Sequence, residues 1–265
     1  MGEVSTATFT LEPIPTHPVR SVLLYIAMEA EAVGVADALG LSAPTVLHAH
    51  SSARRRDGVH QGIRIQLVTA GGDRLLAVDR IGTIPAALAV THALDAHPFD
   101  LIINTGTAGS FLSRGAAIGD LLFARTVQFH DCRVPLPKFD ALSRAFTQLS
   151  CNDAELHAIT ALLPARLGGF STGSSFDATP EELAHFSREE TLAKEMELGA
   201  IAIVARERSV PLIALKSVTD FVDGHEPNHE AFLKNLAFAS EQLAIAMPKL
   251  LAWLSDPLRR REQFA

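Results

Sequence analysis

Three carboxylates lie at the ends of apolar segments, where they could take part in acid–base chemistry. Glu31 follows the apolar run "SVLLYIA", Asp220 ends the run "PLIALKSVTD", and Glu197 enters the apolar helical pattern of "KEMELGAIAIVA" (194–205). An isolated carboxylate against apolar neighbours is costly unless something pairs with it. Three such acids indicate acid–base chemistry on a polar, hydroxyl-rich substrate.

Each of these residues also has a purely structural explanation. Glu31 would lie in the first turn of a helix, where the helix dipole favours an acid. Asp220 could close a turn, and Phe176 in "STGSSFD" could belong to the core. The segment "NTGTAGS" (104–110) matches neither a dinucleotide fingerprint nor a phosphate-binding loop, and alone it favours a tight turn.

A metal site is not supported by the histidines and cysteines. The segment "HEPNH" (225–229) matches a zinc-binding pattern as text, but Pro227 would interrupt the continuous helix which that site requires. We therefore expect Pro227 to open the next helix instead. Cys132 and Cys151 cannot form a disulfide framework, and we predict neither a metal nor a cofactor.

The elements that must position these acids alternate along the chain. Continuous apolar runs predict buried strands, and longer periodic runs predict helices. The expected strands are 21–27, 63–70, 100–106, 120–129 and 211–219. The expected helices are 29–40, 85–97, 153–163, 197–209 and 228–254. This alternation predicts an α/β fold with a largely parallel sheet and helices on both faces.

In such sheets, ligands bind beyond the carboxyl ends of the strands. That rule selects four segments without naming a chemistry. They are 28–31, 106–110, 130–133 and 219–223.

Composition sets the broad class. The chain has 265 residues, 48% of them hydrophobic and 20% charged, with a net charge of −7. We expect one domain over 21–255, a flexible arm over 1–20 and a basic tail over 256–265. The basic runs "ARRRD" and "RRRE" are too short to indicate nucleic acid and predict solvated turns. No apolar run reaches membrane-spanning length and no secretory signal is visible, so we expect a cytoplasmic protein without a membrane partner.

Six motifs occur in the order typical of one family. They are "YIAMEAE", "INTGTAGSF", "GDLLFARTVQFHD", "STGSSF", "KEMELGAIA" and "PLIALKSVTD". Over about 21–240 the chain resembles the nucleoside phosphorylase/nucleosidase superfamily, and most closely the 5′-methylthioadenosine/S-adenosylhomocysteine nucleosidases of the plant type. "DRIGTIPAAL", "FHDCRVPLPKFD" and "VTDFVDG" strengthen the resemblance to that subtype.

The resemblance implies a fold and a reaction. The fold is a single-domain α/β/α sandwich on a twisted mixed sheet, usually a homodimer. The reaction is hydrolysis of the N-glycosidic bond of 5′-methylthioadenosine, with S-adenosylhomocysteine as a further substrate, and belongs to methionine salvage. Two alternatives stay open: a phosphate-dependent phosphorylase, and an inactive nucleoside-binding storage protein. Asn104 stands where related phosphorylases carry an arginine, which favours hydrolysis.

The resemblance also implies roles for individual residues. Asp220 matches the general acid that protonates the purine, and Glu31 matches the acid that activates water. Glu197 matches the residue that binds the ribose hydroxyls, and Phe176 the aromatic ring that stacks on the purine. The other expected substrate contacts are Met28, Thr107, Met196, Lys216 and the backbone of Asp177.

Two features near the expected site concern specificity. Ser174 replaces an aspartate that the family usually carries in "TGDS", and Ser110 stands where a second glycine often occurs. The resemblance implies a pocket for the 5′ substituent that reaches across the dimer interface. We expect Phe129, Pro135 and Pro137 to contribute to it.

Overall fold

A computed structural model describes residues 7–256 of the chain. Its described residues form one eleven-stranded mixed sheet with helices on both faces. The strands are β1 (Thr8–Thr10), β2 (Ser21–Tyr25), β3 (Thr45–Val46), β4 (Arg54–His60), β5 (Ile63–Thr69), β6 (Leu101–Ser110), β7 (Leu121–Phe129), β8 (Phe146–Gln148), β9 (Ala165–Thr172), β10 (Ala193–Glu195) and β11 (Leu212–Phe221). The helices are α1 (Glu29–Leu39), α2 (Thr83–Ala96), α3 (Pro137–Ser143), α4 (Asp153–Leu162), α5 (Pro180–Arg188), α6 (Leu198–Arg208) and α7 (Asn228–Ser255), with a short 3₁₀ turn at Leu112–Arg114.

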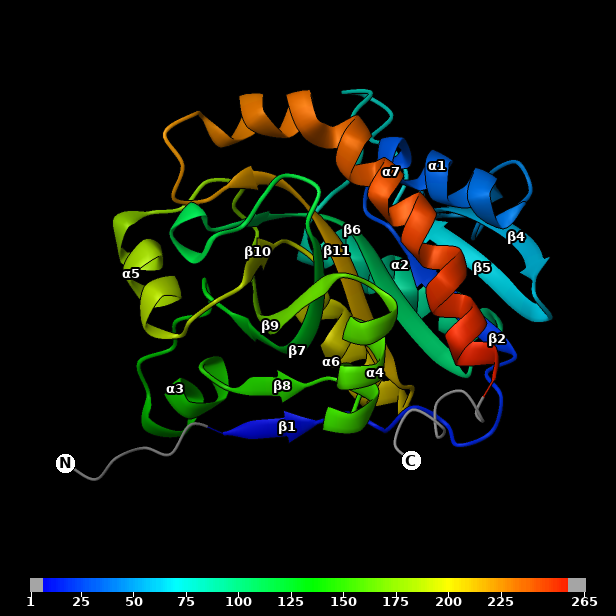
Figure 1. Cartoon of the computed structure of the whole chain (residues 1–265), viewed down its shortest axis with the longest axis horizontal. Coiled ribbons are helices and arrows are strands. Elements are labelled where there is room, and N and C mark those ends of the chain that lie inside the picture. The colour runs from blue at the N-terminus through cyan, green and yellow to red at the C-terminus, as the bar shows by residue number, and fades with distance from the viewer. Residues whose placement is uncertain (1–6, 257–265) are drawn as a thin grey trace.

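Two hydrophobic clusters divide the helices between the faces of the sheet. One cluster joins α1, α4 and α7 to one face, and the other joins α2 and α6 to the opposite face. Figure 1 shows α4 and α7 in front of the strands and α2 behind them. The expected α/β/α sandwich is therefore confirmed.

The sheet contains a closed ring of strands. Strand β11 lies parallel to β6 and antiparallel to β7, β7 pairs with β9, and β10 connects β9 back to β6. Parallel strands β2 and β5 extend the sheet from β6. Because β2, β6 and β11 run in the same direction, their carboxyl ends meet at one edge.

The described part of the expected N-terminal arm is packed onto the sheet. Strand β1 pairs in parallel with β8, and the side chains of Leu11, Ile14 and Val19 are buried. Burial of three apolar side chains and pairing with β8 hold this segment against the domain. Residues 1–6 and the basic run 259–262 lie outside the described residues.

Two local expectations were wrong. The basic run "ARRRD" lies in β4 from Arg54 onward rather than in a turn. Strand β4 pairs antiparallel with β5, and Arg56 contacts the carboxylate of Glu29. No residue of β4 is fully buried, so its arginines keep their charged groups in contact with solvent and do not prevent the strand. The tight turn expected from "NTGTAGS" alone is instead part of a strand, because β6 continues to Ser110.

The structure agrees with the expectation that Pro227 in "HEPNH" stands at the start of the next helix. Pro227 precedes the first residue of α7, so His225 lies outside the helix that carries His229. The two histidines therefore do not share a helical face. No group of three or more potential metal-ligating side chains occurs within residues 7–256. No helix in that range has the length and apolar character needed to cross a membrane.

Candidate active site

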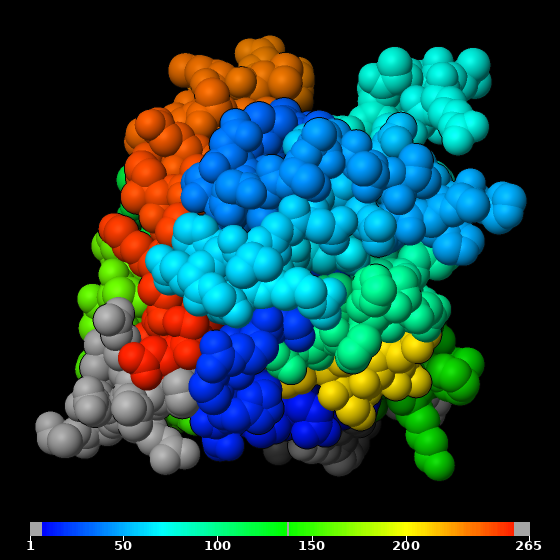
Figure 2. Space-filling view, turned by 90° about the vertical axis from the view of Figure 1, so that its right-hand side faces the viewer, coloured from blue at the N-terminus to red at the C-terminus, as the bar shows by residue number. Residues whose placement is uncertain are grey.

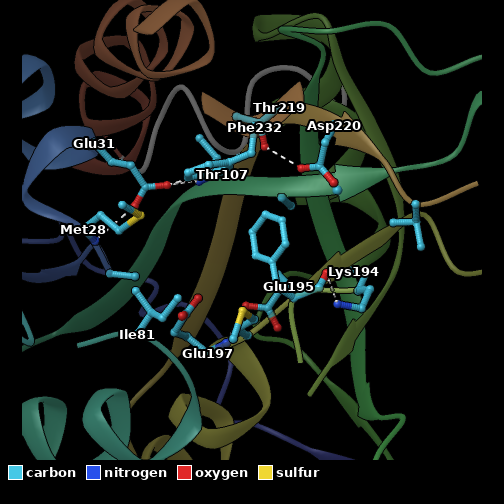
Figure 3. A pocket seen from close by; sticks show the side chains of 16 residues that line it. Met28, Glu31, Ile81, Thr107, Lys194, Glu195, Glu197, Thr219, Asp220 and Phe232 are labelled. Atoms are coloured by element: carbon cyan, nitrogen blue, oxygen red, sulfur yellow. Dashed lines mark hydrogen bonds between the residues drawn. The ribbon is translucent and has the colours of Figure 1, made fainter. Parts of the chain in front are cut away.

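A cavity of about 150 Å³ opens at the carboxyl ends of β2, β6 and β11. Glu31, Glu197 and Asp220 all line it, although they lie far apart in the sequence. Figure 3 shows the three carboxylates on different sides of the same space. Their exposed fractions are only 3–5%, so each needs a specific means of accommodating its charge.

Glu31 is held by donors from two elements. It occupies the first turn of α1, and its Oε1 accepts hydrogen bonds from Thr107 N at 2.7 Å and Thr107 Oγ1 at 2.6 Å. Its Oε2 accepts a bond from Met28 N at 3.1 Å. Gly106 has a φ of 125°, and a Cβ there would lie 3.2 Å from Glu31 Oε2, so the close approach requires a glycine.

Glu197 shares a buried cation with Glu195. Lys216 Nζ lies 3.7 Å from Glu197 Oε2 and 3.6 Å from Glu195 Oε2. Gly82 N donates to Glu197 Oε1 at 3.0 Å. Burial raises the pKa of Glu197 above its usual range, Lys216 opposes that rise, and Glu195 adds to it.

Glu195 fixes the start of α6, which carries Glu197 at its entrance. Its Oε2 accepts hydrogen bonds from Glu197 N at 3.0 Å and Leu198 N at 2.8 Å, and its Oε1 accepts one from Thr172. Backbone N–H groups at a helix start have no partner inside the helix, so this carboxylate satisfies them. The same residue therefore orients Glu197 and neutralises part of the charge on Lys216.

Asp220 reaches the cavity because β11 is irregular beside it. Val218 pairs with Ala108 and Asp220 with Gly109, which leaves Thr219 as an extra residue in β11. The Thr219 carbonyl instead accepts a hydrogen bond from Asn235 on α7 at 2.9 Å. Such bulges redirect neighbouring side chains and often occur beside active sites.

The environment of Asp220 favours its protonated form. Burial raises the pKa of Asp220, and it outweighs the lowering effects of a hydrogen bond from Thr219 and of the Lys194 charge. The Thr219 hydroxyl donates to Asp220 Oδ1 at 2.9 Å. A carboxyl group that stays protonated in a cavity is suited to act as a general acid.

Most of the other expected contacts also line the cavity. Met28, Thr107, Phe176 and Met196 are among its lining residues. The Phe176 ring packs edge-on against Phe232 of α7, with ring centroids 5.5 Å apart. Lys216 is not a lining residue, but it pairs with Glu195 and Glu197, which are. Asp177 is also outside the lining, so its expected backbone contact with the purine stays a prediction.

The residues expected around the 5′ substituent are not brought to this cavity. Phe129 and Pro135 line a separate, larger cavity together with Cys132 and Arg133, and Pro137 begins α3. The expectation placed these residues in a pocket for the 5′ substituent that reaches across a dimer interface, and it stays a prediction. Of the four segments at strand ends, 130–133 is the one whose residues do not reach the central cavity.

Sequence reasoning missed several cavity residues. Lys194 and Glu195 also line the cavity, and their charged side chains within three residues of Glu197 in "KEME" were the available signal. Ile81 and Phe232 also line the cavity. No local pattern distinguishes them from ordinary apolar residues, because they come from a loop and a distant helix.

Comparisons with known proteins find matches over nearly the whole chain. The model of the phosphorylase superfamily matches residues 22–252. A 5′-methylthioadenosine nucleosidase of Arabidopsis thaliana is 36% identical over 250 residues, which cover 90% of this chain and 89% of the relative. A 5′-methylthioadenosine/S-adenosylhomocysteine nucleosidase from the same plant is 33% identical, covering 91% of this chain and 94% of the relative.

The fold is also similar to a solved structure. The apo form of the Arabidopsis thaliana 5′-methylthioadenosine nucleosidase superposes with a TM-score of 0.85 at 35% identity. The match covers 90% of this chain and 97% of that chain.

We expect Lys216→Met to destabilise the protein by about 3–5 kcal/mol at neutral pH, because it leaves two buried carboxylates without their cation. The raised pKa of Glu197 fixes the sign of the pH dependence. Its carboxyl contributes stability fully below the unfolded pKa, and that contribution is lost as pH rises through the folded pKa. Without Lys216 to oppose the rise, the deficit should grow as pH increases.

Urea unfolding of the wild-type and Lys216→Met proteins, from acidic to alkaline pH, measures the effect. Lys249→Met is the matched control, since Lys249 is exposed on α7 and the same change there should stay within about 0.5 kcal/mol. A Lys216→Met protein as stable as wild type at neutral and alkaline pH would contradict the assigned role of the cation.

Proposed function

The chain belongs to the phosphorylase superfamily, and we propose that within it the protein hydrolyses the N-glycosidic bond of 5′-methylthioadenosine and of S-adenosylhomocysteine. The observation that carries this proposal is the convergence of three buried carboxylates, held in three different ways, on one cavity. Cleavage by water would give adenine and the corresponding 5-thioribose, consistent with the expected place in methionine salvage.

Asp220 is the general acid of the proposed mechanism. It transfers its proton to N7 of the purine while the bond between C1′ and N9 breaks and its electron pair moves into the base. Adenine is a poor leaving group unless it is protonated. Burial raises the pKa of Asp220 and so favours its protonated form, which supports this role.

Glu31 and Glu197 act on the sugar side. Glu31 accepts a proton from the water whose oxygen bonds to C1′, and the donors at Thr107 and Met28 hold its carboxylate in place. Glu197 accepts hydrogen bonds from the ribose hydroxyls, and its negative charge stabilises the positive charge that develops on the sugar. Gly82 N occupies only its Oε1, so acceptor positions remain for the diol.

Water rather than phosphate is the proposed nucleophile. Phosphate binding requires cationic or amide-rich groups, with arginine as the favoured clamp. No arginine lines the cavity in the described part of the chain. Its lysine, Lys194, already donates to the carbonyl oxygens of Ser175 and Phe176.

We also propose that the protein is a cytoplasmic homodimer. Apolar side chains are exposed on the loop 73–82 and on α2, which is a surface suited to a second copy. They are Leu75, Leu76, Val78, Ile84 and Leu88. Figure 2 shows the loop projecting from the surface. A molar mass near 28.4 kDa in light scattering, the mass of one chain, would contradict the dimer.

Adenine release from 5′-methylthioadenosine should proceed at full rate without phosphate, and the sugar product should be free 5-methylthioribose. Mass spectrometry of the products with and without added phosphate checks this. Strict phosphate dependence with a sugar 1-phosphate as product would replace the proposal with a phosphorylase. Absence of adenine release from either proposed substrate would leave the non-enzymatic alternative.

Asp220→Asn should lower turnover by about 10²–10⁴-fold, because an amide cannot supply the proton. The fold should be retained. The pKa of Asp220 is raised, so its contribution to stability falls as pH rises, and the variant should become more stable than wild type at alkaline pH.

Steady-state kinetics and thermal unfolding across pH measure both effects. Asp37→Asn is the control, because Asp37 is exposed on α1 and outside the cavity. Near-normal turnover of Asp220→Asn would remove Asp220 as the acid.

A further inference from the structure

Lys194 is a buried cation that the proposed mechanism does not use. It lies on the short strand β10, is 5% exposed, and lines the cavity. A buried ammonium group is costly unless it is hydrogen-bonded or paired. Burial lowers the pKa of Lys194, and the charge of Asp220 is the largest effect that opposes this lowering.

The ammonium group of Lys194 is hydrogen-bonded to the segment that carries Phe176. Lys194 Nζ donates to the carbonyl oxygens of Ser175 and Phe176, the latter at 3.0 Å. Two adjacent carbonyls held by one buried group restrict the backbone just before Asp177, whose backbone is expected to meet the purine. An ammonium has three N–H donors, so one remains after these two bonds.

The register of the strands places Lys194 and Asp220 at matching positions on either side of β6. Gly109 on β6 is the pairing partner of Lys194 on β10 and also of Asp220 on β11. Two strand spacings separate the backbones of Lys194 and Asp220 by about 10 Å, a gap that a lysine side chain can largely span. Figure 3 shows both side chains on the side of the cavity opposite Glu31.

Gly109 keeps the space between them open. A Cβ at this position would lie 3.0 Å from Asp220 Oδ2 and 2.9 Å from Val222 Cγ2. Any larger residue would therefore press on the carboxylate. The absence of a side chain at Gly109 allows the cation and the acid to act on each other across β6.

We propose that Lys194 is a positioning residue that fixes the Ser175–Phe176 segment at the purine end of the cavity and stabilises Asp220 in its ionised form across Gly109. This inference rests on the proposed function for the identity of the purine site. When the O–H bond of Asp220 breaks and the N7–H bond forms, a carboxylate is left in a largely apolar wall. The nearby ammonium lowers the cost of that charge and so makes Asp220 a more effective acid.

The charges around this pair set the expected direction of change. Lys194 on β10 and the Thr219 hydroxyl on β11 both lower the pKa of Asp220 against the effect of burial. Lys194 itself is surrounded by Glu182 of α5, Asp177 of the neighbouring loop and Glu195 of β10. Removing its charge should therefore raise the pKa of Asp220 further, and no other cation lines the described cavity to replace it.

The direct test is the titration of Asp220 by ¹³C NMR in protein labelled at aspartate Cγ, with Asp220→Asn used to assign the signal. Lys194→Met should raise the pKa of Asp220 by about 1 unit or more, as expected for loss of a nearby opposite charge. Lys194→Arg should restore the wild-type titration. Lys249→Met, which removes an exposed lysine on α7, should leave it unchanged.

Kinetics give a second readout. In Lys194→Met the alkaline limb of the pH profile of kcat/KM should move to higher pH, because the pKa of Asp220 rises. Near neutral pH, KM should rise because the Ser175–Phe176 segment is no longer held. Under the same conditions kcat should fall about tenfold or more, because Asp220 is a weaker acid. An unshifted Asp220 titration in a folded Lys194→Met protein would overturn the inference. A wild-type protein that releases no adenine would instead overturn the proposed function, and the NMR titration would still decide the role of Lys194.

Discussion

The candidate site depends on four carboxylates that are buried at one edge of the sheet, where little solvent screens their charges. Glu31, Glu195, Glu197 and Asp220 are all nearly inaccessible to solvent, and burying a carboxylate is unfavourable unless the fold compensates for it. The compensation differs from one acid to the next. Glu31 receives three hydrogen bonds, Glu195 and Glu197 share Lys216, and Asp220 has only a hydroxyl donor and a more distant cation. These differences allow acids of similar intrinsic strength to take different roles, since environment sets which of them stays protonated.

The topology explains why residues so distant in sequence converge. Strand β11 is the last strand in the sequence, yet it pairs with β6 and β7 in the interior of the sheet. Its carboxyl end therefore lies beside those of β2 and β6. The extra residue Thr219 then reorients Asp220, and α7 holds that irregularity through Asn235. Helix α6 brings Glu197 from the opposite face, with its start fixed by Glu195.

Much of this arrangement could be predicted from sequence, because its signals are local. The continuous apolar runs identified β2, β5, β6, β7 and β11, and the position of Glu31 and Asp220 just beyond or at the end of such runs marked them as ligand-facing. Order among the motifs then implied the roles of Glu197 and Phe176. Each of these residues lines the cavity.

The features that were missed have weak local signals. Strand β10 contains three residues and is defined by its pairing with β6 and β9. The charges in "KEME" mark Lys194 as close to Glu197 in sequence, but they do not indicate that its side chain faces the cavity. Strand β4 is rich in arginine and is held by pairing with β5 rather than by its own apolar pattern. The pairing of Gly109 with both Lys194 and Asp220 depends on the closure of a ring of five strands, which no single segment encodes.

The most direct measurement of the central claim is a crystal structure with a non-cleavable C-nucleoside analogue of 5′-methylthioadenosine that carries a nitrogen at the N7 position. The account predicts hydrogen-bond contact, at about 3 Å, between Asp220 and that nitrogen and between Glu197 and the ribose hydroxyls, with Glu31 in contact with a water beneath C1′. An analogue bound in another cavity, or bound here with these carboxylates out of contact, would contradict it.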